Sequence, residues 1–429
     1  MKKVLPFLLF ICVFFIMLVG CNNNVSSPKS TNYTSIYLLQ NDEIIPIIKD
    51  YNRINSNKQI KITQFENMDT LNIKLTSEIM SGAGPDLISY NRFTNNQNIR
   101  KFINSNAFAD LNELINNDQS KDKLILDNYN QVVINSGVYN GKRLFFPLTY
   151  SVEALVTSKE NCEKYNIVDN GLFSFDQIDK KFEKFLKEQN RNKDMYAAYP
   201  TKLFFKKMLS DYIDFNKGTF NFKTEEFKNQ FLSIEKTYKN FNSGDSFDPL
   251  IQIAKGNILF IEGYFCGNPY VSVQEAKEFF ELGATPVIQT LSHDKNSYSG
   301  IVSSFLAINN NSTQKEEALN FIKFTLSEKK QLKVETNELP VNNKAYDSYI
   351  KKANNFIKTE FHEEDKNNVV DFLNNYQQMI ENVNSCNFDD FYYMENIFIP
   401  CLNEYLDKTV NYNTFLNRLT NRTKIYLEE

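Results

Sequence analysis

Apolar residues recur along the first hundred positions with two different periods, one typical of strands and one typical of helices. Residues 35–40, 59–65 and 86–90 form short apolar or alternating runs, which predict three strands. Between them, 43–55 and 69–81 place apolar side chains three and four positions apart, which predicts two amphipathic helices. Two successive β-α-β units of this kind favour a doubly wound, mostly parallel sheet.

The segment around residue 140 predicts a tight turn followed by a passage into a second part of the chain. Asn140-Gly141 lies between apolar residues, which is a strong short-range signal for a β-hairpin. Because Pro147 cannot donate a hydrogen bond to a sheet, we expect the strand to end there and a new strand to begin a few residues later. Tyr150 and Glu153 would then lie where the chain passes from its first part to its second.

Beyond this crossing the pattern is mostly helical. Apolar and aromatic residues at helical spacing predict helices over 202–215, 224–241 and 317–332, with strands over 283–288 and 298–308. The remainder, 342–429, is expected to be helical throughout. Aromatic stripes at helical spacing are typical of cores, and the chain has 37 Phe to bury.

The first residues are typical of an export signal. A charged start and an apolar run up to Val19 predict that residues 1–20 are removed as a signal peptide. The segment Leu18-Val19-Gly20-Cys21 resembles the bacterial lipobox, which implies that Cys21 becomes the lipidated first residue of the mature protein. Residues 21–33, rich in Asn and Ser, are expected to form a flexible tether. An uncleaved membrane anchor is the alternative interpretation of the same apolar run.

Composition narrows the range of partners and cofactors. The net charge of −4 gives no support to a basic footprint, so we expect no nucleic-acid partner. The sequence has no C-x-x-C and two histidines far apart, so neither a metal site nor a cofactor is expected. The cysteines besides Cys21 in the mature chain are Cys162, Cys266, Cys386 and Cys401. A disulfide between Cys386 and Cys401 and a set of buried thiols both remain open.

Polar residues follow the three predicted strands at their carboxyl ends, where ligands collect in an open parallel sheet. Asn41, Glu66, Tyr90 and Asn91 lie at these ends. Asn and Glu side chains can exchange hydrogen bonds with hydroxyl groups, and a Tyr ring offers an apolar face to a pyranose. These residues are therefore candidate ligand contacts, with ordinary polar loops as the alternative.

Several short segments resemble motifs of the family 1 extracytoplasmic solute-binding proteins of ABC importers, the sugar-binding group. The matching residues are Gly82, Pro85, Asp86 and Leu87; then Gly141, Lys142, Pro147, Tyr150, Ser151, Leu155 and Lys159; then Gly256, Phe260, Gly263 and Tyr264; and finally Asn337–Val341. Tyr264 stands where this family usually has Trp, and the whole chain contains no Trp. Stacking on a sugar would therefore come from Tyr or Phe.

The resemblance implies an α/β architecture of two lobes, the type II periplasmic-binding-protein-like fold. This fold has doubly wound sheets, three segments that cross between the lobes, and a helical C-terminal part. The expected first lobe comprises 34–140 and 289–336, and the expected second lobe comprises 141–288 and 337–429. The residues expected to face the cleft from the crossings are Tyr150, Glu153, Tyr264 and Ser299.

The resemblance also implies a function without covalent chemistry, so we do not expect an enzyme. We expect a monomer, lipid-anchored on the outer face of a bacterial cell membrane, that encloses a small polar solute, with carbohydrate favoured. It would deliver the solute to the transmembrane subunits of an ABC permease. Two alternatives remain open: a sensor subunit for a membrane histidine kinase or chemoreceptor, and a surface carbohydrate hydrolase with Glu66 and Glu153 as paired acids.

Overall fold

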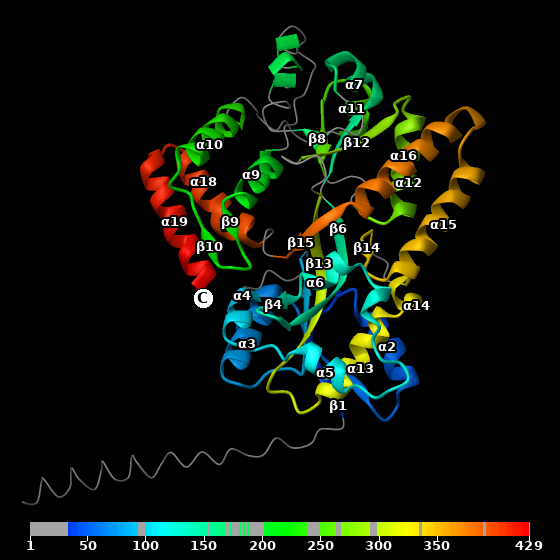
Figure 1. The fold of residues 1–429 in the computed structure, drawn as a ribbon, viewed down its shortest axis with the longest axis vertical. Helices are drawn as coiled ribbons and strands as arrows, with labels where there is room; N and C mark the ends of the chain where they lie inside the picture. The colour runs from blue at the N-terminus through cyan, green and yellow to red at the C-terminus, as the bar shows by residue number, and fades with distance from the viewer. Residues whose placement is uncertain are drawn as a thin grey trace, which may run out of the picture. The chain divides into compact units, whose positions relative to one another are not determined.

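The computed structural model describes residues 33–428 except 93–98, 153, 168–171, 174–179, 182, 186, 189–200, 239–248, 263–266, 292–297, 334–336 and 389–391. These residues belong to one unit that begins at Tyr33 (Figure 1). The predicted signal peptide, Cys21 and the tether up to residue 32 lie outside the described residues. Within the described part of the chain, no helix has both the length and the apolar character needed to span a membrane.

The larger of the sheets has seven strands, in the order β14-β6-β13-β3-β1-β2, with β15 beside β13. Their bounds are β1 Tyr33–Leu39, β2 Gln59–Phe65, β3 Leu87–Asn91, β6 Phe145–Val152, β13 Tyr298–Ile308, β14 Leu339–Pro340 and β15 Val383–Asn387. β1 pairs in parallel with both β2 and β3, which confirms the predicted β-α-β units. β13 runs antiparallel to β3 and β6, so the sheet as a whole is mixed.

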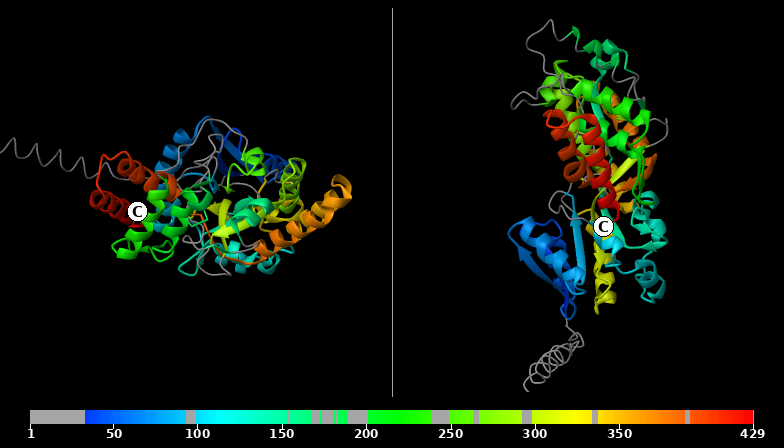
Figure 2. Two further views of the ribbon diagram at one scale, coloured as in Figure 1. Left: turned by 90° about the horizontal axis from the view of Figure 1, so that it is seen from above. Right: turned by 90° about the vertical axis from the view of Figure 1, so that its left-hand side faces the viewer.

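Helices cover both faces of this sheet. Alternate residues of its strands point to opposite faces and accordingly belong to two separate apolar clusters. On one face lie α2 Ile45–Ile54, α5 Leu111–Asn117, α6 Gln131–Asn135 and α13 Lys315–Leu326; on the other lie α3 Met68–Met80 and α4 Ile99–Asn104. α15 Asn343–Glu360 and α16 Glu363–Glu381 pack against α12 Pro269–Glu281, and α16 also lies beside β12 Pro286–Leu291. α2 and α3 confirm the first two predicted helices. The helix predicted over 317–332 is interrupted at Ser327, whose backbone is extended, and resumes as α14 Glu328–Gln331. Figure 2 shows this arrangement from two further sides.

The chain turns at Asn140-Gly141 as predicted and then continues further than predicted. β4 Val138–Tyr139 and β5 Lys142–Arg143 pair across a turn in which Asn140 and Gly141 have φ angles of +50° and +80°. The expectation that the next strand ends at Pro147 is wrong, because β6 runs through it. The register between β6 and β13 shifts on both sides of Ser304, beside Pro147. The missing N–H of Pro147 therefore falls at an irregular point of the ladder, where proline is tolerated.

The region after residue 342 is not helical throughout. β15 pairs in parallel with the first residues of β13 and completes the larger sheet. Its sequence, VNSCN, lacks apolar alternation, so the hydrophobic pattern gives no strand signal there. Gly300 of β13 permits the close approach of β15, because a Cβ at this position would lie 3.1 Å from the Sγ of Cys386.

The smaller sheet has four strands, in the order β11-β7-β12-β8. Their bounds are β7 Leu155–Ser158, β8 Leu172–Phe173, β11 Ile261–Glu262 and β12 Pro286–Leu291, and the helices packed beside them are α7 Lys159–Tyr165, α11 Pro249–Ala254 and α12 Pro269–Glu281. The chain passes between the two sheets from β6 to β7 and from β12 to β13. β14, where the sequence predicts a third crossing, pairs with β6 in the larger sheet.

A third apolar cluster gathers aromatic side chains from both halves of the chain. It includes residues of α9 Thr201–Ser210, α10 Glu225–Tyr238, α18 Ile399–Leu406 and α19 Tyr412–Glu428. The rings of Phe231 and Phe415 stack there with centroids 4.6 Å apart. α9 ends before the predicted Phe215, because β9 Ile213–Asp214 pairs with β10 Thr219–Phe220.

The described cysteines are thiols. Cys162, Cys386 and Cys401 all carry unoxidised sulfur, so no disulfide joins Cys386 to Cys401. Cys162 and Cys401 are buried, whereas Cys386 is half-buried. Cys266 lies outside the described residues.

Candidate functional site

A charged pair spans the carboxyl edge of the larger sheet. Arg92 follows β3 directly, and Glu338 precedes β14 directly. An Nη2 atom of Arg92 lies 3.1 Å from Oε1 of Glu338, and the two side chains are 14% and 11% exposed. The main-chain N–H of Arg92 also donates to the carbonyl of Ser303 at 2.8 Å, which fixes the position of the arginine against β13.

The Arg92–Glu338 pair reaches across two strands. Adjacent strands are about 4.8 Å apart, so three steps from β3 to β14 separate the main chains by ~14 Å. The long arginine side chain and the glutamate side chain bridge that distance over β13 and β6. Ser303 of β13 and Thr149 of β6 consequently lie beneath the Glu338 carboxylate, where their hydroxyls lower its pKa.

Glu338 is a buried carboxylate with one oxygen left without a hydrogen bond. Burial raises its pKa above the usual range, and the Arg92 charge with the nearby hydroxyls only partly offsets this. Among the described residues, neither Oε2 of Glu338 nor Oγ of Ser303 makes a hydrogen bond of normal geometry, although both atoms are buried. A buried carboxylate oxygen of this kind is a ready acceptor for a donor from outside the chain.

Two further carboxyl groups follow β1 at the same edge. Burial raises the pKa of Asp42, although the N–H of Ile44 donates to it at 3.1 Å and acts in the opposite direction. Burial also raises the pKa of Glu43, and the negative charges of Glu338 and Asp42 add to the effect. Asp42, Glu43, Arg92 and Glu338 therefore form one electrostatically coupled group, which we call the edge cluster. Within the described residues, no group of three or more His, Cys, Asp or Glu is arranged to hold a metal ion.

The sequence-predicted contacts at strand ends flank the edge cluster. Asn41 and Glu66 are exposed at the ends of β1 and β2, and Asn91 is the last residue of β3. Ser299 is half-buried, with its hydroxyl 3.0 Å from that of Ser385 on β15. Their contact with a ligand stays a prediction.

The predicted contacts Glu153 and Tyr264 lie outside the described residues. Gly267, three residues beyond Tyr264 in sequence, does lie close to the edge cluster. A Cβ at Gly267 would lie 1.4 Å from the carbonyl oxygen of Asn337, the residue before Glu338. The N–H of Asn268 donates to that same oxygen at 2.8 Å, and the Tyr376 hydroxyl donates to the Gly267 carbonyl. The segment that follows β11 is thereby held against the segment that carries Glu338.

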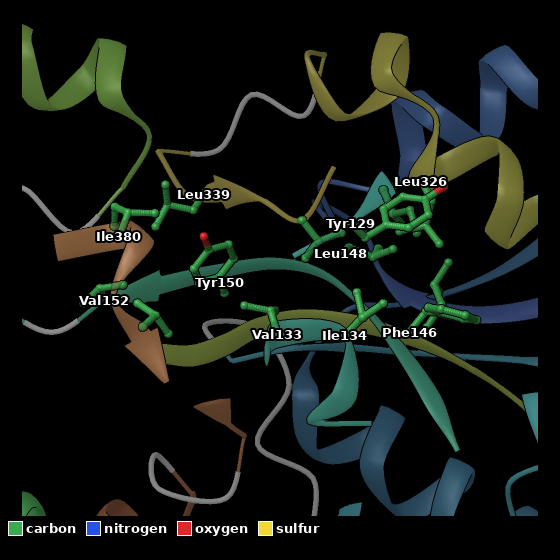
Figure 3. Packing of buried hydrophobic residues seen from close by; sticks show 14 of the residues in the cluster. Tyr129, Val133, Ile134, Phe146, Leu148, Tyr150, Val152, Leu326, Leu339 and Ile380 are labelled. Atoms are coloured by element: carbon green, nitrogen blue, oxygen red, sulfur yellow. The ribbon is translucent and has the colours of Figure 1, made fainter. Parts of the chain in front are cut away.

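Tyr90 and Tyr150, also predicted as ligand contacts, are core residues in this structure. Tyr150 is 2% exposed, and Figure 3 shows its ring among Val152, Leu339 and Ile380. Asn130 donates to its hydroxyl at 3.3 Å, and burial raises its pKa. Tyr90 is equally buried, and its ring stacks on Phe305 with centroids 4.8 Å apart. The expectation that Tyr150 faces the cleft is wrong, because β6 continues past Pro147 and carries the ring inside.

The charged members of the edge cluster are not among the residues that the sequence singled out as ligand contacts, although two of them stand at the same strand ends. Asp42 and Arg92 directly follow Asn41 and Asn91, so the rule that ligands collect at strand ends covers them equally. Glu338 lies in the Asn337–Val341 turn, but nothing local indicates that its partner is Arg92. A search for charged residues at all strand ends and crossings would have found the three carboxyls and the arginine.

Comparison with known proteins identifies the family. A family model described as a bacterial extracellular solute-binding protein matches residues 47–359, which is most of the chain. The chain belongs to this family. A search of curated protein sequences finds no match.

Solved structures show the fold of this solute-binding protein. It is similar to an ABC substrate-binding protein from Listeria monocytogenes in complex with cycloalternan, with a TM-score of 0.60, 14% identity, and 92% of this chain and 98% of that chain covered. A cyclic alpha-maltosyl-1,6-maltose binding protein from Arthrobacter globiformis gives a TM-score of 0.58 at 14% identity, with 92% and 99% covered. A Thermotoga lettingae solute-binding protein bound to alpha-D-tagatose gives 0.58 at 13% identity, with 92% and 100% covered.

These similarities confirm the two-lobe periplasmic-binding-protein fold predicted from the sequence motifs. The solute-binding protein has its edge cluster at the carboxyl ends of parallel strands, where open α/β sheets place their ligands. The division of residues between the lobes stays a prediction.

Proposed function

We propose that this protein captures a small polar solute, with carbohydrate favoured, between its two lobes and delivers it to an ABC import permease. The observation that carries the proposal is the buried Glu338 carboxylate, which Arg92 holds in place with one oxygen left to accept a hydrogen bond. The family match and the sugar complexes of the Listeria and Thermotoga proteins support this solute class.

Binding and closure are the same event in this proposal. A solute that contacts residues of both lobes only when they approach favours the closed form by its difference in affinity for the two forms. The residues of the edge cluster bind and orient solute, and no bond-breaking step is assigned to them.

The solute class can be found with a thermal-shift screen of the mature chain from residue 21, carrying Cys21→Ser to prevent lipidation. Sugars, sugar alcohols, amino sugars, amino acids and polyamines form the screen, because a ligand of the native state raises the melting temperature by mass action. Deletion of the gene should then abolish uptake of the solute found. Normal uptake with loss of a transcriptional or chemotactic response would support the sensor role instead.

Glu338→Gln should weaken binding of that solute by about tenfold or more, because a hydrogen bond to a charged group contributes about 1.5–3 kcal/mol. The glutamine keeps an oxygen that Arg92 can reach, so the fold should persist, as melting curves will show. Calorimetric titration measures the affinity. Glu113→Gln, which removes an exposed carboxylate from α5, is the matched control. Equal affinity in the Glu338→Gln protein and the parent protein would contradict the proposed site.

We further propose that Cys21 carries lipid and holds the protein on the outer face of the cell membrane. Cys21→Ser should move the protein from the membrane fraction to the culture medium or periplasm, because no acyl chains remain to anchor it. Immunoblots of cell fractions and the mass of the mature N-terminus measure this change. Ser26→Ala, a substitution in the predicted tether, should leave the protein on the membrane. Membrane retention of the Cys21→Ser protein would exclude the lipid anchor.

A further inference from the structure

The edge cluster holds more negative than positive charge. Asp42, Glu43 and Glu338 act on one another, and Arg92 already pairs with Glu338. Within the described part of the chain, no cation lowers the pKa of Asp42 or of Glu43. With all groups ionised, the edge cluster would carry two negative charges that no cation among the described residues balances.

Two half-buried carboxylates elsewhere in this chain, Asp50 and Asp118, have a cation of their own. Lys330 lies 2.5 Å from Asp50, and its hydrogen bond brings the pKa of that carboxyl down to about 2. Burial raises the pKa of Asp118, but hydrogen bonds from Ser120 and Lys323 outweigh it and bring that pKa to about 2 as well. The carboxyls of the edge cluster shift the other way, so this region differs from the structural ion pairs of the same protein.

The unused hydrogen-bonding atoms of the edge cluster point to the same missing partner. Ser303 is 2% exposed, its hydroxyl lies beside the Glu338 carboxylate, and its Oγ makes no hydrogen bond of normal geometry among the described residues. Oε2 of Glu338 is buried and equally without one. One group that donates several hydrogen bonds would satisfy both oxygens at once.

We propose that the solute carries a protonated amine, and that its ammonium group binds between Glu43 and Glu338 with Ser303 as a further acceptor. This inference rests on the proposed function, in which the edge of the larger sheet is the solute site. It narrows the solute to an amine, such as an amino sugar or an aliphatic diamine. An ammonium group fits because it offers three N–H donors and one positive charge, whereas a hydroxyl offers one donor and no charge.

The expected pH dependence has a definite sign. A bound ammonium group favours the ionised carboxyls, so affinity should fall as the pH is lowered and the carboxyls of raised pKa take up protons. Among the described residues, the charged groups that face Glu43 are Asp42 from its own segment and Glu338 from the segment before β14. Arg92 from the end of β3 faces Glu338. Binding should release protons, which calorimetry in buffers of different ionisation enthalpy detects.

The test compares amines with uncharged molecules of the same shape. The Cys21→Ser mature chain is titrated at about pH 7.5 with glucosamine against glucose, galactosamine against galactose, and putrescine against 1,4-butanediol. The tightest ligand should be an amine that binds at least about tenfold more tightly than its uncharged counterpart. Whether that amine is glucosamine, galactosamine or putrescine shows whether the solute is an amino sugar or a diamine. Glu43→Gln should lower amine affinity about tenfold without lowering the melting temperature, because it removes a negative charge that Glu338 and Asp42 repel. Glu113→Gln should leave amine affinity unchanged.

The outcomes separate this inference from the proposed function. Tightest binding by glucose, galactose or butanediol would overturn the amine and leave a solute-binding protein. Amine affinity that is unchanged in Glu43→Gln, or that rises at low pH, would also overturn it. Saturable binding of calcium, tested with calcium chloride, would show that a metal ion balances the negative charge of the edge cluster. That result would overturn the inference as well. Absence of binding by every member of all three pairs, and by the wider thermal-shift screen, would overturn the proposed function together with the inference.

Discussion

Tyr150→Ala is expected to lower the free energy of unfolding by about 3–5 kcal/mol, the usual cost of removing a buried aromatic ring. The side chain is 2% exposed and lies in the main apolar cluster, on a strand with β13 on one side and β14 on the other. Alanine would leave a cavity between strands that cannot easily collapse, because all eight residues of β6 are buried. Denaturant unfolding followed by circular dichroism measures the change.

Tyr150→Phe is the matched control for this result. Phenylalanine keeps the ring and loses only the 3.3 Å hydrogen bond from Asn130, so the loss should stay within about 0.5–1.5 kcal/mol. A stable alanine variant that binds solute poorly would restore the sequence-based expectation that Tyr150 is an accessible contact. Equal stability of the alanine and phenylalanine variants would show that the ring is not packed as described.

Gly267→Ala is expected to lower both stability and solute affinity. An added Cβ would lie 1.4 Å from the carbonyl oxygen of Asn337, so one of the two main-chain segments must move. Overpacking of this kind costs about 1–3 kcal/mol, and the movement would shift Glu338, the next residue. We expect solute affinity to fall at least tenfold, since small displacements of a positioned group weaken its contacts. Melting curves and calorimetric titration measure the two effects.

Gly283→Ala separates the contact at Gly267 from general backbone strain. Gly283 has a φ angle of +77°, and an added Cβ there would meet no atom within 4 Å. Alanine at this position should cost roughly 1–2 kcal/mol through strain alone and leave solute affinity unchanged. Similar affinity losses in both variants would show that Gly267 has no special relation to Glu338.

The first half of the larger sheet could be predicted because its signals are local. Strand and helix periods over 35–81 lie within single elements, and the parallel pairing of β1 with β2 follows from the helix between them. The turn at Asn140-Gly141 was equally predictable, since both residues adopt the positive φ angles that this sequence favours. Such features need no knowledge of distant partners.

The course of the chain after Pro147 could not be predicted in the same way. Proline usually ends a strand, but here the ladder absorbs it through register shifts that involve β13, more than a hundred residues later. β15 depends on the same distant strand, and its polar sequence has no apolar period of its own. Tertiary pairing decided both outcomes against the local signal.

The candidate site, like the fold, could be predicted only in part. The sequence pointed through Asn41 and Asn91 to the sheet edge that carries the edge cluster, because their neighbours Asp42 and Arg92 belong to that cluster. The pairing of Arg92 with Glu338 joins residues far apart in the chain and depends on the order of four strands. Only the strand order brings these charges together.

The position of β15 affects how this protein can be exported. The larger sheet takes its first strand from Tyr33–Leu39 and its last from Val383–Asn387, near the end of a chain of 429 residues. A chain that emerges from a translocation channel with its amino end first therefore cannot complete this sheet until nearly all of it is outside. Folding across the membrane must wait for the last quarter of the polypeptide, and a truncated secretion product would expose the open flank of β13.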